Sequence, residues 1–77
     1  MIAWHVCSAA KLNKYLRTGA ITPPVRAWRT IDQAERMSLS SGRRLILRLK
    51  FPDDAPTLPG HFGLAVYSDE PIRVEGI

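Results

Sequence analysis

The chain of 77 residues is poor in the residues that build disulfide-bonded, zinc-binding or membrane-spanning proteins. Its one cysteine, Cys7, cannot form an intramolecular disulfide, and two histidines with one thiol do not make a structural zinc set. No apolar run reaches the roughly 18 residues that span a bilayer, and the N-terminus lacks the basic lead and long apolar run of a signal peptide. These absences predict a soluble cytoplasmic protein without a bound metal.

The length of the chain leaves no room for a second hydrophobic core, so we expect a single compact domain over residues 1–77. Hydrophobic residues make up 45% of the chain and charged residues 23%, which excludes the composition of a disordered protein. A core of this size gives a free energy of unfolding of only ~3–5 kcal/mol, so the loss of one core side chain will be felt.

Acidic residues are scarce in the first part of the chain. Residues 1–50 hold ten lysines or arginines against Asp32 and Glu35, a net charge of +8, whereas residues 51–77 hold Arg73 against five acids, a net charge of −4. Such a split steers an anionic partner toward one face, or lets the two ends of a small fold attract each other. The sequence leaves both interpretations open.

The first part of the chain predicts a strand followed by a helix. Ile2–Val6 is a short apolar run, and Ser8 is placed to cap a helix that begins at about Ala9. Gly19 ends this helix, because glycine readily takes the left-handed conformation. The apolar positions of the helix recur at spacings of three and four: Ala9, Leu12, Tyr15 and Leu16.

A second strand and a second helix follow. Two prolines in Thr22–Pro24 forbid further helix and lead into a strand at Val25–Trp28. Thr30 and Gln33 have the spacing of a capping box, in which each side chain bonds the backbone of the other residue. We expect Gly42 to end this helix.

The remaining elements complete an α+β domain. Leu45–Phe51 alternates apolar with mostly basic residues and predicts a strand with one buried face. Three prolines make Pro52–Gly60 an expected irregular loop, Phe62–Tyr67 reads as another strand, and Ile72–Val74 as a short terminal strand or an extended tail. The predicted order is β-α-β-α-β-β, with two helices and a small mixed or antiparallel sheet.

Four motifs follow one another in this order: Trp4-His5-Val6-Cys7-Ser8, Leu12-x-x-Tyr15-Leu16-x-x-Gly19, Val25-Arg26-Ala27-Trp28 and Ile31-Asp32-Gln33-Ala34-Glu35. The later strand 45–51 and the ending 70–77 continue the pattern. The whole resembles the ADP-ribosyltransferase-like fold in its small bacterial and phage forms. Members of that family begin with a Tyr-His-Val-Thr type strand and a Leu-x-x-Ile-Leu-x-x-Gly-Leu helix.

The resemblance implies a site for NAD. In that family the histidine of the first strand holds the ribose of NAD and an aromatic residue of the next strand motif lines the nicotinamide pocket, which makes His5 and Trp28 the cofactor-binding candidates. A late strand of the family often supplies a catalytic glutamate, whereas Phe62–Tyr67 has no acid and Glu70 follows it. The catalytic candidates are His5 and Glu70, and the missing acid favours a repurposed copy over a working transferase.

Each candidate also has a structural interpretation. His5 can bond backbone carbonyls instead of a ligand. Trp4 and Trp28 can supply the large apolar areas that a small core needs. Cys7 precedes a helix start, which favours a thiolate, and it shares a strand face with His5, which leaves a Cys/His pair open. We expect it to be inert because the sequence shows no catalytic partner beyond His5.

Six basic residues raise a separate hypothesis, a phosphate-binding patch for nucleic acid on which Trp28 stacks a base. The candidates are Arg26, Arg29, Arg43, Arg44, Arg48 and Lys50. The alternative is a solvated basic strand face, which prevents sheets from pairing edge to edge.

Three functions therefore remain. The first is a small non-catalytic binding module on an ADP-ribosyltransferase-like scaffold, such as a phage or mobile-element inhibitor that binds a larger protein or nucleoprotein complex. The second is a minimal NAD-dependent ADP-ribosyltransferase, and the third is a small basic nucleic-acid-binding protein. NAD is the only cofactor that the resemblance implies, and the sequence leaves the partner and the oligomeric state open.

Overall fold

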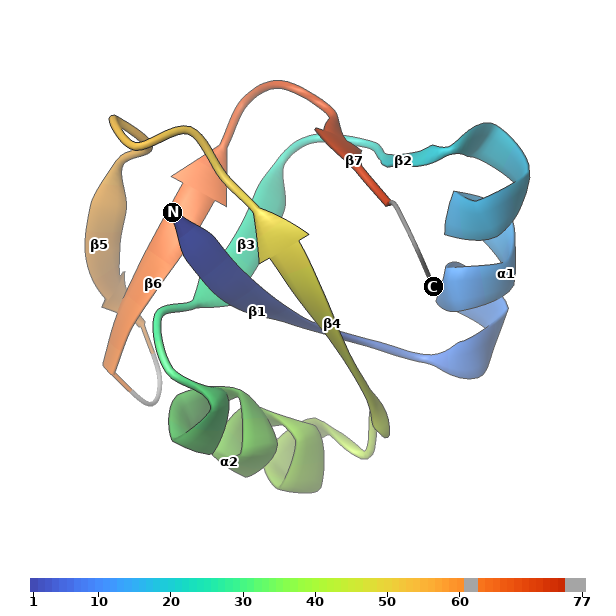
Figure 1. Cartoon of the computed structure of the whole chain (residues 1–77). Helices are drawn as coiled ribbons and strands as arrows, with labels where there is room; N and C mark the ends of the chain where they lie inside the picture. The colour runs from blue at the N-terminus through green and yellow to red at the C-terminus, as the bar shows by residue number, and fades with distance from the viewer. Residues whose placement is uncertain (61–62, 75–77) are drawn as a thin grey trace.

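A computed structural model describes residues 1–60 and 63–74 of the chain (Figure 1). The helices and strands follow in the order β1 (Ile2–Cys7), α1 (Ala9–Thr18), β2 (Ala20–Ile21), β3 (Val25–Trp28), α2 (Ile31–Ser41), β4 (Leu45–Lys50), β5 (Thr57–Gly60), β6 (Gly63–Ser68) and β7 (Ile72–Arg73). Two helices packed on small antiparallel sheets confirm the predicted α+β class.

The main sheet is antiparallel and has five strands in the order β4-β1-β3-β6-β5. Helix α2 covers one face and contacts β1, β3 and β4. Strands β2 and β7 pair into a second small sheet that lies over the opposite face together with α1 (Figure 1). The main sheet is therefore the middle layer, and α2 lies on the other side of it from α1.

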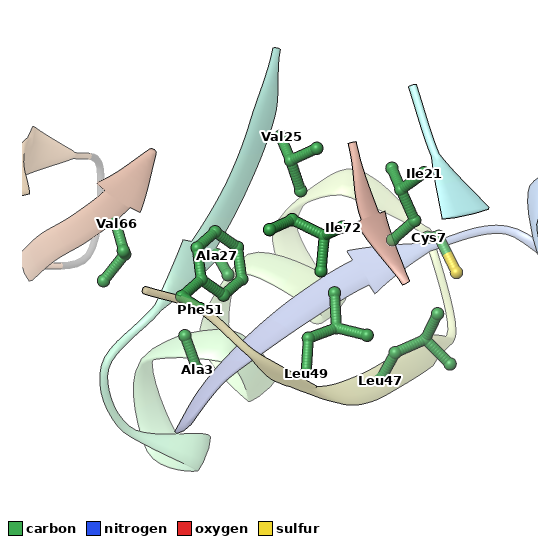
Figure 2. Close-up of a cluster of buried hydrophobic side chains, with 10 residues drawn as sticks. All are labelled: Ala3, Cys7, Ile21, Val25, Ala27, Leu47, Leu49, Phe51, Val66 and Ile72. Carbon is green, nitrogen blue, oxygen red and sulfur yellow. The ribbon is translucent and has the colours of Figure 1, made fainter. Parts of the chain in front are cut away.

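The buried side chains form two clusters, one on each face of the main sheet. The main core lies under the β2–β7 sheet (Figure 2) and consists of Ala3, Cys7, Ile21, Val25, Ala27, Leu47, Leu49, Phe51, Val66 and Ile72. The second cluster lies under α2 and consists of Val6, Trp28, Ala34 and Ala65. Alternation along each strand supplies both clusters, because successive side chains point to opposite faces.

The predicted helix boundaries are confirmed by their caps. Ser8 and Thr30 each accept a hydrogen bond from a backbone N–H of the first turn that follows, both at 3.3 Å. Gly19 and Gly42 close the two helices in the left-handed conformation, with φ of 78° and 74°. These are the terminal signals that local sequence can encode, since they need no tertiary partner.

The reciprocal half of the predicted capping box is wrong. Gln33 Oε1 is buried and has no hydrogen-bond partner among the described residues, so it does not bond back to Thr30. The Gln33 side chain lies instead against Gly63, where an added Cβ would collide with it. Gly63 has a φ of 123°, a conformation that favours glycine. Packing against the β5–β6 hairpin therefore takes the side chain away from the cap.

The prediction of an irregular loop over Pro52–Gly60 is wrong for its second half. Thr57–Gly60 forms β5, which pairs with β6 and borders the sheet. Pro59 lies opposite Leu64 in this pair. The prolines concealed the strand, because an edge strand tolerates a residue without an N–H and a central strand does not.

The last two strands differ in detail from the prediction. Strand β6 includes Ser68, and Phe62, which the sequence assigned to it, lies outside the described residues. Ile72–Arg73 forms β7, which confirms the terminal strand, and it pairs with Ala20–Ile21, a strand that the sequence did not predict. Residues 75–77 of the family-like ending also lie outside the described part.

Two leucines give a matched test of the core. Leu49 is 3% exposed, whereas Leu39 on α2 is 86% exposed. We expect Leu49→Ala to lower the free energy of unfolding by about 2–5 kcal/mol through the cavity it leaves, and Leu39→Ala to change it by less than about 0.5 kcal/mol. Urea unfolding followed by tryptophan fluorescence measures both, and equal losses would contradict the assigned core.

Candidate functional site

The central strands β1 and β3 part soon after they meet. Trp4 pairs with Trp28, and a regular antiparallel ladder would then set His5 opposite Ala27 and Val6 opposite Arg26. The carbonyl oxygen of Arg26 instead lies 2.6 Å from Nδ1 of the His5 side chain. Beyond this bond β1 leads to α1, whereas β3 leads back toward β2 (Figure 1). An imidazole ring thus takes the place of a backbone contact where the strands separate.

A pocket of about 310 Å³ opens at this parting, and we call it the β1–β3 pocket. It combines three aromatic side chains, two guanidinium groups and one imidazole with apolar walls. The lining residues are Trp4, His5, Val6, Pro24, Arg26, Ala27, Trp28, Met37, Arg43 and Tyr67. Within the described part of the chain, no carboxylate lines this pocket.

The bond to Arg26 fixes the state of the His5 ring. A carbonyl oxygen only accepts, so Nδ1 carries the proton and Nε2 of the neutral ring is an acceptor. Burial lowers the pKa of His5, the bond to the Arg26 carbonyl opposes this shift, and the charges of Arg43 and Arg26 add to it. His5 is therefore neutral near pH 7, and its buried Nε2 has no hydrogen-bond partner among the described residues.

Trp28 has both of the roles that the sequence left open. It is 2% exposed and belongs to the cluster under α2, which is the structural role. It also lines the β1–β3 pocket, and its Nε1 is buried without a hydrogen-bond partner in the described part of the chain. The guanidinium carbon of Arg26 lies 5.1 Å from the centre of the Trp28 ring, within range of a cation–π contact. Trp4 is half-buried beside it.

The catalytic candidates of the sequence do not meet. His5 lines the β1–β3 pocket, whereas Glu70 is exposed in the turn between β6 and β7. The backbone N–H of Glu70 donates to Oγ of Ser68 at 3.1 Å, and this bond holds the turn. Glu70 is not among the residues that line the pocket.

Four of the six basic candidates line one of two hollows, and Arg29 and Arg44 line neither. Arg26 and Arg43 line the β1–β3 pocket. Arg48 and Lys50 lie on β4 at the edge of the sheet, beside a different hollow. The other two are exposed. The six basic candidates therefore do not line a single pocket.

Sequence reasoning missed part of the pocket. Tyr67 enters it because β6 pairs with β3 in a register that sets Tyr67 opposite Arg26. Met37 enters from α2 and Pro24 from the segment before β3. The sequence predicted strand β6 but not that it pairs with β3. Register between distant strands depends on the assembled core.

Cys7 does not extend the site toward nucleophilic or metal chemistry. Its side chain is buried, and burial raises the pKa of its thiol. The described residues hold no group of three or more His, Cys, Asp or Glu side chains that could bind a metal ion. No helix in the described part of the chain is long and apolar enough to cross a membrane.

Comparisons of the chain with protein-family models, with curated proteins and with solved structures found no match. The resemblance to the ADP-ribosyltransferase-like fold therefore stays a prediction. A function has to be inferred from the chemistry of the pocket, because a fold by itself does not fix an activity.

The lowered pKa of His5 predicts how stability depends on pH. In the unfolded chain His5 regains its ordinary pKa of 6.5 and takes up a proton at a higher pH than in the folded protein. The free energy of unfolding is therefore full above pH 6.5 and falls as the pH drops toward the lower folded pKa.

The variant His5→Asn isolates this effect, because its amide nitrogen replaces Nδ1 as a donor but does not titrate. Urea unfolding at about pH 7.5 and about pH 5 should show a larger loss for the natural protein than for the variant. The other titrating groups are common to both proteins. The same loss in both would refute a His5 that is neutral in the folded protein.

Proposed function

We propose that the protein is a non-catalytic binding module whose β1–β3 pocket holds a nucleotide-like ligand. One observation carries the proposal: His5, Arg26, Trp28 and Arg43 line one pocket, with no carboxylate among its described lining residues. Aromatic faces accept a flat ring, and guanidinium groups accept a phosphate. The neutral imidazole of His5 offers an acceptor to a hydroxyl group. A ligand with a flat ring, hydroxyl groups and negative charge therefore matches the aromatic, imidazole and guanidinium groups of the pocket.

The orphaned polar atoms support the same class of ligand. Nε2 of His5 and Nε1 of Trp28 are buried without partners, and we propose that a bound ligand reaches both, Nε2 through a donor such as a sugar hydroxyl and Nε1 through an acceptor. Leaving such buried atoms unpaired costs ~1–3 kcal/mol each, which a fitting ligand recovers. A volume of about 310 Å³ is at the small end of ligand sites. It suits one nucleotide half of NAD better than the whole dinucleotide.

ADP-ribosyl transfer ranks behind binding. A transferase needs negative charge beside the transferred sugar, where positive charge develops in the transition state. The described lining supplies two guanidinium groups and no carboxylate, and Glu70 lies elsewhere.

The partner that we propose for the module is a larger protein or nucleoprotein complex. The module would block it as an inhibitor of the kind that phages or mobile elements encode.

An NMR titration of the isotope-labelled protein with NAD tests the proposal. We expect saturating amide shifts at His5, Val6 and Trp28, and none of comparable size at β5. The variant His5→Asn keeps the donor to the Arg26 carbonyl but lacks Nε2. Its affinity for NAD should therefore be about fivefold lower, which corresponds to the loss of one hydrogen bond of ~1 kcal/mol. No shifts at millimolar NAD in a folded protein would refute a nucleotide pocket.

A second reading of the same samples separates binding from catalysis. If the module is non-catalytic, NAD stays intact after prolonged incubation with the protein, as chromatography of the nucleotide would show. Release of nicotinamide that His5→Ala abolishes, while the variant stays folded, would replace the module with the transferase.

A further inference from the structure

Strand β4 has an open edge with a defined set of backbone groups. Met1 and Phe51 exchange two hydrogen bonds, N to O, each 2.7 Å long, and the β1–β4 register continues from this pair without interruption. Bonded and non-bonded pairs alternate in an antiparallel ladder. The N–H and C=O groups of Ile46, Arg48 and Lys50 therefore point away from β1. Within the described part of the chain no strand pairs with this side of β4.

A groove of about 580 Å³ runs beside this edge, between β4 and β7, and we call it the edge groove. Its apolar lining includes Leu49, Phe51, Pro71 and Ile72. Ile72 points toward Leu49 across the space between the two sheets (Figure 2). One wall of the groove is therefore apolar and faces the side of the sheet that bears the main core.

All of the charged residues that line the edge groove are basic. Arg48 and Lys50 extend from the edge strand and are exposed, and Arg73 lines the groove from β7. Among the described residues no acidic side chain lines the groove. Arg48 and Lys50 share a strand face with Ile46, which packs toward α2, so the charges lie on the face opposite to the apolar wall.

We propose that the β4 edge binds an extended acidic segment of a partner protein, which joins the main sheet as a sixth strand. Strand addition satisfies the outward N–H and C=O groups of Ile46, Arg48 and Lys50. A residue opposite Arg48 would place its side chain on the charged face, and its neighbours would place theirs in the edge groove. The partner segment thus alternates carboxylate and apolar side chains.

A second copy of the chain fits this edge less well. Antiparallel pairing of β4 with the β4 of another molecule brings arginine and lysine side chains of both copies onto one face, where like charges repel. The outer strand β5 offers no acidic side chain to β4 and includes Pro59, which lacks an N–H. Charge complementarity therefore selects an acidic strand over the strands of this protein.

The probe is the blocked hexapeptide acetyl-Glu-Val-Glu-Val-Glu-Val-amide, titrated into the labelled full chain. We expect saturating shifts and slowed hydrogen exchange at the amides of Ile46, Arg48 and Lys50. The peptide acetyl-Glu-Glu-Glu-Val-Val-Val-amide has the same composition without the alternation, and it should bind at least tenfold more weakly. Equal binding of the two peptides, or none of either, would overturn the proposal.

Two variants of Arg48 distinguish the contribution of its backbone N–H to peptide binding from that of its side-chain charge. Arg48→Gln removes the charge and keeps the outward N–H, whereas Arg48→Pro removes both. Because this N–H does not bond β1, an edge proline leaves the ladder intact, which the amide spectrum checks. The proline variant should bind the alternating peptide at least fivefold more weakly than the glutamine variant. The same affinity for both would reduce the contact to charge alone.

Other occupants of the edge give distinct results. Self-association through β4, detected by sedimentation and abolished by Arg48→Pro, would replace the acidic partner with a second copy. Binding of a ten-nucleotide single-stranded oligonucleotide at the same amides, tighter than the peptide and steeply weakened by salt, would assign the edge to nucleic acid and overturn the proposal. His5→Asn should leave peptide binding unchanged, because the β1–β3 pocket is a different site.

Discussion

The hydrogen bond between Nδ1 of His5 and the carbonyl of Arg26 is the contact on which the candidate site depends. It occupies the position where the ladder between β1 and β3 would otherwise continue. The Arg26 carbonyl accepts this bond in place of the one that the Val6 N–H would donate in a continued ladder. The same bond orients the ring, so that Nε2 is left as an unsatisfied acceptor. One side chain of the pocket lining therefore lies where the two strands separate and carries a polar atom without a hydrogen-bond partner among the described residues.

Basic residues line both of the hollows described above. The β1–β3 pocket has Arg26 and Arg43, and the edge groove has Arg48, Lys50 and Arg73, with no described acid in either lining. At the acidic end of the chain, Asp53 is 97% exposed and bonds the N-terminal amine at 2.7 Å, which lowers the pKa of its carboxyl. The Met1–Asp53 contact is an attraction between the two ends of the fold, and the two basic hollows are the surfaces that we propose for anionic partners.

Local signals predicted the elements, and distant pairing decided the site. The caps at Ser8 and Thr30 and the alternation of Leu45–Phe51 need only neighbouring residues, and they were readable. Strand β5 was hidden by Pro59 and by the prolines before it, because its assignment depends on the partner β6. His5 and Trp28 were found through a family resemblance, whereas Tyr67 required the register between β3 and β6. No pattern in the sequence indicated that β1 and β3 part.

The nitrogen-15 spectrum of the His5 imidazole, recorded near pH 7 with and without NAD, tests the account most directly. The predicted spectrum has a proton on Nδ1 and an unprotonated Nε2, and the Nε2 resonance moves on addition of NAD as it accepts a hydrogen bond. A proton on Nε2 with Nδ1 unprotonated would contradict the account. In that state Nδ1 of His5 cannot donate to the Arg26 carbonyl, and the contact at the centre of the account would not exist.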